Sequence, residues 1–202
     1  FAQVKKVLTE IDTPYKAGQF LYGVNGVSQA EVDLDNGEHV ILTVFDQAKV
    51  GGGDTVYQIV NQIKRPKVVD GKPNRRFDVT LLINGLPIIQ IELKKALHST
   101  TESLNQMKQY VAEKQYSGIY STLQILIAMT PYQIKYMAKT TLDSFNRAFA
   151  FEWQDEDDAT PVRHWKEFAD KVLSIPMAHD IATRYMVLDG TKNKESIKVM
   201  RS

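Results

Sequence analysis

The chain has 202 residues with a net charge of +1, long enough for a full core but without the basic excess usual in dedicated DNA-binding domains. It contains no cysteine, which excludes disulfides, a thiolate metal site and a cysteine nucleophile. No apolar run approaches the roughly 18 residues that span a membrane, and no signal peptide is visible. We therefore expect a cytoplasmic protein. Because the chain starts at Phe1 and not at Met, we expect either a piece of a longer protein or a chain that lacks a disordered start.

The first third of the chain predicts a helix, a hairpin and a strand. Asp35-Asn-Gly37 marks the hairpin turn between two short apolar segments. The expected elements are a helix over 4–11, strands over 31–34 and 39–45, and a strand over 57–64. Gly51-Gly-Gly-Asp54 is not a phosphate-binding loop, because no Gly-Lys-Ser/Thr follows it, so we expect a flexible loop and no ATP site.

Residues 76–95 predict two strands joined at Asn84-Gly85, a strong hairpin signal. A two-residue loop there would set Glu92 opposite Phe77 and bury a carboxylate among apolar side chains. A three-residue loop, Ile83-Asn84-Gly85, pairs Asp78 with Gln90 instead and leaves Gly85 in a left-handed bulge position. We expect this second register, because it also gathers the apolar residues of both strands on one face, namely Phe77, Val79, Leu81, Ile89, Ile91 and Leu93.

In that register Asp78 lies diagonal to Glu92, and Lys94 shares their face. Mg²⁺ prefers oxygen ligands, so Asp78, Glu92 and the carbonyl of Leu93 form a candidate metal site. Two carboxylates and an ammonium at one point suit Mg²⁺-dependent hydrolysis of a phosphodiester. In that reaction Lys94 could hold the attacking water or stabilise charge on the phosphate. The alternative is a surface salt-bridge ladder, since Glu-x-Lys is a common pattern.

A helix over 100–113 is expected to follow, because Ser99-Thr-Thr-Glu102 is a capping box. Gln106 and Tyr110 are four residues apart and therefore neighbours on one face. They could bond a metal-bound water or a phosphate beside the Glu-x-Lys strand. Ordinary helix surface remains the alternative.

A basic segment precedes the first strand of this hairpin. We expect it to contact DNA phosphates, and a solvated loop is the alternative. Its predicted DNA-binding residues are Lys64, Arg65, Lys67, Arg75 and Arg76.

The rest of the chain predicts scaffold. Strands are expected over 123–129 and 132–136, extended chain over 145–153, a helix after Thr160-Pro161, and a last helix over 176–187. We divide the chain into a main domain, 1–155, and a helical extension or linker, 156–202. The expected fold class is α/β, with a mixed β-sheet flanked by helices.

The two predicted strands and the helix after them resemble a known protein family. The stretch Arg76-Phe-Asp-Val-Thr-Leu-Leu-Ile-Asn-Gly-Leu-Pro-Ile-Ile-Gln-Ile-Glu-Leu-Lys-Lys95, followed by Gln106-x-x-x-Tyr110, resembles the N-terminal nuclease domain of the R subunit of type I restriction enzymes. Residues 57–62 also resemble the preceding strand of that family. Its members have a restriction-endonuclease-like fold of the PD-(D/E)xK superfamily.

The resemblance implies a Mg²⁺-dependent endonuclease domain that cleaves double-stranded DNA. Asp78, Glu92 and Lys94 would be catalytic, with Gln106 and Tyr110 in support. Residues 1–155 would be the nuclease domain, and 156–202 would lead toward a motor domain that this chain lacks. The full subunit would add that ATP-driven motor and assemble with methylation and specificity subunits. The family often adds an upstream acid, but no motif fixes Glu10 or Glu31 in that role, and we leave both out. The competing function is a non-catalytic module that binds DNA or another subunit through a nuclease-like fold.

Overall fold

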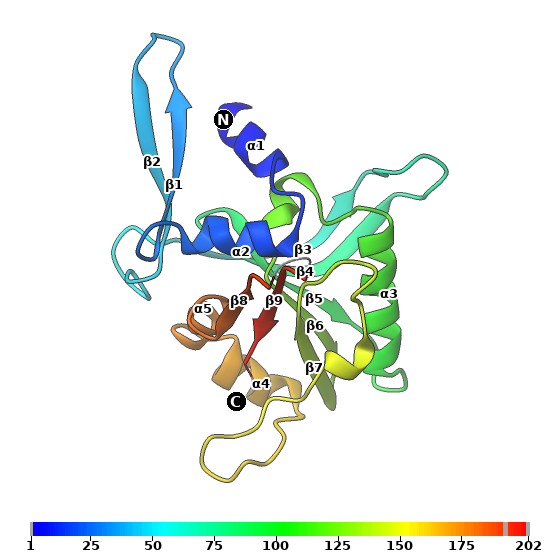
Figure 1. Ribbon diagram of the computed structural model, residues 1–202. Helices are drawn as coiled ribbons and strands as arrows, with labels where there is room; N and C mark the ends of the chain where they lie inside the picture. The colour runs from blue at the N-terminus through cyan, green and yellow to red at the C-terminus, as the bar shows by residue number, and fades with distance from the viewer. Residues whose placement is uncertain (1, 192–193, 201–202) are drawn as a thin grey trace.

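The structure is a computed structural model that describes residues 2–191 and 194–200 (Figure 1). In chain order its elements are α1 (Ala2–Thr9), α2 (Pro14–Tyr22), β1 (Val27–Asp33), β2 (His39–Asp46), β3 (Tyr57–Arg65), β4 (Arg75–Ile83), β5 (Leu86–Leu93), α3 (Thr100–Ala112), the 3₁₀ turn η1 (Gly118–Thr122), β6 (Ile125–Thr130), β7 (Gln133–Ala138), the 3₁₀ turn η2 (Arg147–Phe149), α4 (Trp165–Val172), α5 (Met177–Ala182), β8 (Met186–Asp189) and β9 (Ser196–Val199).

The centre of the molecule is a five-stranded sheet in the order β3-β4-β5-β6-β7. β5 and β6 are parallel, while the other neighbours are antiparallel. A parallel pair needs a crossover connection, and α3 with η1 supplies it (Figure 1). The mixed sheet flanked by helices confirms the predicted α/β, restriction-endonuclease-like fold class.

The two faces of the sheet carry separate hydrophobic clusters, and β6 shows why. Every residue of β6 is buried, as expected for a central strand covered on both faces. Ile125 and Ile127 face the cluster that includes α4 and α5. Leu126 and Ala128 face the cluster that includes α3. The site described below lies at the α3 face.

The β4–β5 hairpin differs from the expected register. Asn84 and Gly85 both have left-handed backbone, with φ of 51° and 77°, and Ile83 pairs with Leu86. This is the two-residue turn, so the predicted longer loop is wrong. A register shift next to Leu81 then inserts one extra residue in β5. Because of this extra residue, Glu92 is not placed opposite Phe77. Rules for hairpin turns alone do not predict such a bulge.

Beyond the bulge, Thr80 pairs with Gln90 and Val79 with Ile91. Continuing this register sets Asp78 beside Glu92 rather than beside Gln90. The expected pairing of Asp78 with Gln90 is therefore wrong by two positions on β5. The expected proximity of the two carboxylates holds, because bulge and turn together leave them on the same face.

Two of the six apolar residues do not share the predicted face. Phe77 packs against Tyr110 and Tyr116 on the α3 side, with ring centroids 5.1 and 5.4 Å away. Leu93 is 41% exposed. The change of face between Val79 and Phe77 lies opposite the point in β3 where Gln62 has a left-handed backbone, with φ 52°.

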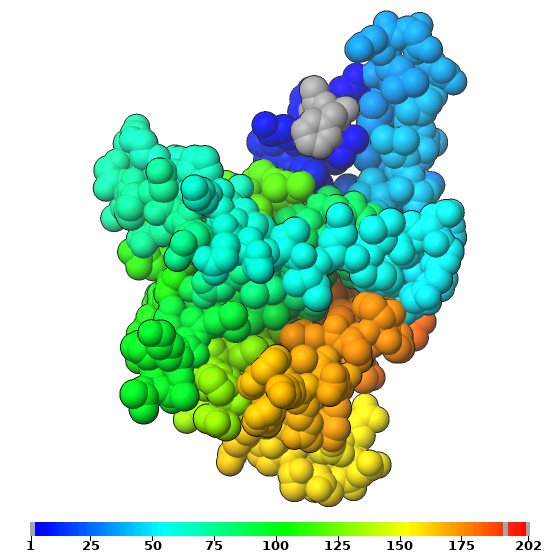
Figure 2. All heavy atoms as spheres, turned by 180° about the vertical axis from the view of Figure 1, so that it is seen from behind, coloured from blue at the N-terminus to red at the C-terminus, as the bar shows by residue number. Residues whose placement is uncertain are grey.

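The N-terminal third contains both expected and unexpected elements. The helix α1 and the β1–β2 hairpin confirm the predictions there. The hairpin and the loop between β3 and β4 project from the body at separate places (Figures 1 and 2). The helix α2 was not expected. Its signal is Thr13-Pro14, since the Thr13 side chain accepts from the Lys16 N–H and Pro14 opens the first turn.

The C-terminal part is not purely helical. The predicted last helix to Val187 is wrong, because α5 ends at Ala182 and a β8–β9 hairpin follows. Buried Ile197 and Val199 flank exposed Lys198, a strand pattern. Side chains of α4 and α5 join the cluster under the sheet, while the domain division at residue 155 stays a prediction. Within the described ranges, no helix is long and apolar enough to cross a membrane.

Candidate active site

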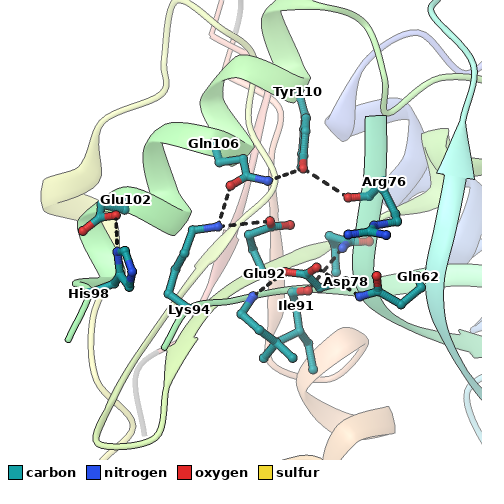
Figure 3. A network of polar contacts seen from close by, with 12 residues as sticks. Gln62, Arg76, Asp78, Ile91, Glu92, Lys94, His98, Glu102, Gln106 and Tyr110 are labelled. Atoms are coloured by element: carbon teal, nitrogen blue, oxygen red, sulfur yellow. Dashed lines mark hydrogen bonds and ion pairs between the residues drawn. The ribbon is translucent and has the colours of Figure 1, made fainter. Parts of the chain in front are cut away.

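Two adjacent strands and one helix bring the five predicted site residues together (Figure 3). Asp78 comes from β4, and Glu92 from β5, with Lys94 just beyond its end. The Leu93 N–H donates to Asp78 Oδ2 at 2.9 Å, which ties the two strands at the site. Lys94 Nζ lies 3.5 Å from Glu92 Oε1. The acid–acid–lysine cluster predicted from spacing is therefore present.

Glu92 is a buried carboxyl group. It is 1% exposed, and this burial, together with the negative charge of Asp78, raises its pKa to about 8 despite the opposing charge of Lys94. Its Oε2 atom has no hydrogen-bond partner among the described residues. A buried carboxylate oxygen without a partner is costly unless a ligand satisfies it.

The helix α3 completes the network from above the strands. It begins with the predicted capping box, in which Ser99 and Glu102 satisfy each other's backbone. Lys94 Nζ donates to Gln106 Oε1 at 2.6 Å, and Gln106 Nε2 donates to the Tyr110 hydroxyl. Burial raises the pKa of Tyr110 to about 12, so its phenol stays protonated at neutral pH.

The tyrosine hydroxyl in turn donates to the Arg76 carbonyl at 3.4 Å. The chain of contacts therefore runs from Glu92 through Lys94, Gln106 and Tyr110 back to β4. Each polar group restrains the next, so the lysine ammonium is held beside the carboxyl group.

The donor set suits a hard cation. Mg²⁺ commonly takes one or two carboxylates and completes its shell with waters and phosphate oxygens. Asp78 and Glu92 supply two carboxylates, and the free Glu92 Oε2 is an available ligand atom. No group of three or more His, Cys, Asp or Glu side chains suited to a metal occurs in residues 2–191 and 194–200. A third protein ligand would therefore be an oxygen of another kind, such as the predicted Leu93 carbonyl.

The two upstream acids lie on the N-terminal elements. Glu10 follows α1, and Glu31 is an exposed residue of β1 whose Oε2 lies 4.0 Å from His39 Nε2. Neither belongs to the network of Figure 3.

Two of the five predicted DNA-binding residues are half-buried against partners within the chain. Arg75 makes a two-pronged contact to Glu113, at 2.7 and 2.5 Å. Arg65 donates to the Gln115 and Ser117 carbonyls and lies over the Tyr120 ring, 4.4 Å from its centroid.

The other three basic residues are exposed. Lys64 and Arg76 reach solvent on neighbouring strands, and Lys67 pairs loosely with Asp70 at 3.3 Å. They lie on or beside the strand that carries Asp78, so a phosphate backbone could reach them and the site together.

Sequence reasoning missed one polar residue of the site. Gln62 on β3 donates from Nε2 to Asp78 Oδ1 at 3.3 Å (Figure 3). The segment that contains it is part of the family resemblance, but nothing in the residue pattern distinguishes Gln62 from Gln58 on the same strand.

The mixed sheet, the paired carboxyl groups and the adjacent lysine are the features of a restriction-endonuclease-like domain. The family model described as "Type I restriction enzyme R protein N terminus" matches residues 15–145. The chain belongs to this family, as its motifs predicted.

Relatives with curated names agree. The chain is 31% identical over 137 residues to an endonuclease subunit of a type I restriction enzyme from Staphylococcus saprophyticus, covering 68% of this chain and 14% of the relative. It is 27% identical over 135 residues to such a subunit from Staphylococcus aureus strain COL, covering 67% and 14%. It is 29% identical over 147 residues to the EcoprrI endonuclease subunit from Escherichia coli, covering 71% and 44%. The chain thus spans a small part of the first two relatives.

Proposed function

We propose that this chain is a Mg²⁺-dependent endonuclease domain that hydrolyses phosphodiester bonds of double-stranded DNA within a type I restriction subunit. The observation that carries the proposal is the Glu92 carboxyl group. It is buried, its Oε2 has no partner among the residues described, and it lies beside a second acid and a lysine. A salt-bridge ladder on a strand surface would leave such a group in water.

Asp78, Glu92 and the Leu93 carbonyl would hold the metal. Bound Mg²⁺ would acidify a water and neutralise charge on the phosphate. Lys94, fixed by Gln106 at 2.6 Å, would orient that water or stabilise the oxygen that gains charge. Tyr110 stays protonated and acts as a donor, which holds Gln106 in place.

DNA would approach across β3 and β4. Lys64, Lys67 and Arg76 offer exposed charge for phosphate contacts. Arg65 and Arg75, predicted as phosphate ligands too, would serve chiefly to brace these strands against the segment after α3, since both guanidinium groups already have protein partners.

The names of the relatives, which are endonuclease subunits of type I restriction enzymes, support a place in a larger enzyme. We propose that this domain works in the cytoplasm, in a longer subunit with an ATP-driven motor and alongside methylation and specificity subunits. The ATP site would lie outside this chain.

The test is calorimetric titration of Mg²⁺ or Mn²⁺ into the wild-type chain and Glu92→Ala, with short duplex DNA present. Metal binding that is lost in the variant supports the nuclease. Asp78→Asn should then keep or improve DNA binding, because one negative charge is removed, while cleavage disappears. Equal metal behaviour of wild type and Glu92→Ala would favour the alternative, a non-catalytic module that binds DNA or a subunit.

A further inference from the structure

Gln62 has an unusual backbone for its place in the fold. It lies inside β3, an edge strand of the sheet, yet its φ is 52°. This left-handed conformation is unfavourable for a residue with a Cβ atom and rare within strands. Such outliers persist when the surrounding structure imposes them, and they gather at functional sites.

The distortion is confined to one position. Asn61 pairs with Val79, and Ile63 pairs with Phe77, in the same register on either side. The position between these two pairs faces Asp78. The strand therefore departs from regular geometry only where it passes the proposed metal ligand, and it does so without gaining or losing a residue.

The Gln62 carboxamide contacts the site. Its Nε2 donates to Asp78 Oδ1 at 3.3 Å, while the Leu93 N–H donates to Asp78 Oδ2 at 2.9 Å. Both oxygens of the carboxylate thus accept a hydrogen bond, one from each neighbouring strand (Figure 3). Two donors on opposite oxygens restrict rotation of a carboxylate, and partners of this kind orient metal ligands.

We propose that Gln62 is a positioning residue that holds the Asp78 carboxylate in its metal-binding orientation, at the expense of a strained backbone. This inference rests on the proposed metal-dependent function. Gln62 itself need not touch the metal or the phosphate. The left-handed backbone occurs at the residue whose carboxamide contacts Asp78.

Two substitutions separate the carboxamide from the backbone. Gln62→Met keeps the length of the side chain and the strained backbone but removes the donor. Gln62→Gly also removes the donor, while glycine accepts φ of 52° without strain. The matched control is Asn61→Gly, which removes an exposed carboxamide from the neighbouring position on the same strand.

In calorimetric titrations with Mg²⁺ or Mn²⁺, both Gln62 variants should bind about tenfold or more weakly than wild type, and Asn61→Gly should bind normally. The free energy of unfolding in denaturant should rank the two glycine variants the other way round. Asn61→Gly should be less stable than wild type, and Gln62→Gly should be at least as stable as wild type. Wild-type metal affinity in Gln62→Met would overturn the proposal.

A metal-free measurement separates this inference from the proposed function. Loosening Asp78 should speed hydrogen exchange at the Leu93 amide, which donates to it, in both Gln62 variants. If wild type binds no metal but Leu93 responds in this way, the nuclease proposal fails and the positioning contact stands. Unchanged Leu93 exchange in both variants overturns the positioning role.

Discussion

The carboxyl groups of Asp78 and Glu92 interact across the β4–β5 pair, and of the two Glu92 is the buried one, at 1% exposed. This asymmetry gives the acids different tasks. Asp78 is held by donors from both neighbouring strands. Glu92 lies in a low-dielectric environment where losing its proton is costly without a cation.

Metal binding should therefore release a proton. Burial and the charge of Asp78 raise the pKa of Glu92 to about 8, so Glu92 is largely protonated at pH 7, and a metal must displace that proton. We expect Mg²⁺ affinity to rise about tenfold per pH unit below pH 8 and to level off above it. Calorimetry in two buffers of different ionisation enthalpy measures the proton count. A flat affinity from pH 6 to 9 would contradict this.

Without metal, the same group should make stability depend on pH. The folded-state pKa of Glu92 is raised, so its contribution is fully present below the unfolded pKa and is lost as the pH rises through about 8. Glu92→Gln should consequently be more stable than wild type at pH 9, by about 2–4 kcal/mol, and the difference should shrink at pH 5.

Denaturant unfolding at pH 5, 7 and 9, with chelator present, measures this difference. Glu156→Gln is the control, because it removes the same charge from an exposed loop and should show little change with pH. A Glu92→Gln advantage of equal size at all three values would mean that the carboxyl group does not titrate as described.

Arg75→Ala should destabilise the fold. The Glu113 side chain is 2% exposed, and removing its arginine partner leaves that carboxylate without its charged donor, at a cost of about 2–3 kcal/mol. Arg75 lowers the pKa of Glu113, so the loss should be present at neutral pH and fade as the pH falls through that lowered pKa.

Thermal or denaturant unfolding provides the comparison. Lys67→Ala serves as the control, since it breaks only an exposed pair with Asp70, worth less than about 1 kcal/mol. Equal losses for Arg75→Ala and Lys67→Ala would show that the buried pair adds nothing.

Lys64→Ala and Arg76→Ala should weaken DNA binding without destabilising the protein. Both side chains are exposed, and because each would neutralise one DNA phosphate, each substitution should lower the slope of log affinity against log salt by about 1. Fluorescence anisotropy with a short duplex at several salt concentrations measures this slope. Lys166→Ala, on α4, is the control, and an equal decrease of the slope in that variant would point to nonspecific attraction.

The sequence predicted which side chains gather at the site better than it predicted how the strands pair. Spacing and parity brought Asp78, Glu92 and Lys94 together, and the capping box correctly placed the helix that carries Gln106 and Tyr110. These inferences succeeded because they depend on local periodicity, which the amino-acid pattern contains directly.

The failures depend on local backbone geometry. The bulge in β5 changes its pairing with β4, and the only mark in the sequence is the neighbouring Pro87, since proline inside a central strand favours a bulge. The left-handed Gln62 has neither a glycine nor a proline beside it to mark it. Phe77 was misplaced for the same reason. The β8–β9 hairpin was missed because its strands are four residues each, too short for a periodic signal.

The last strand to join the site determines its environment. Every predicted catalytic side chain lies between Asp78 and Tyr110, yet Glu92 pairs with Ala128 of β6, and the Lys94 N–H donates to the Met129 carbonyl. During synthesis the reactive groups thus emerge from the ribosome well before the strand that shields Glu92 from water. A nascent chain that ends before β6 has all five residues but lacks the strand that pairs with Glu92, so the buried environment of this carboxyl group requires the completed sheet.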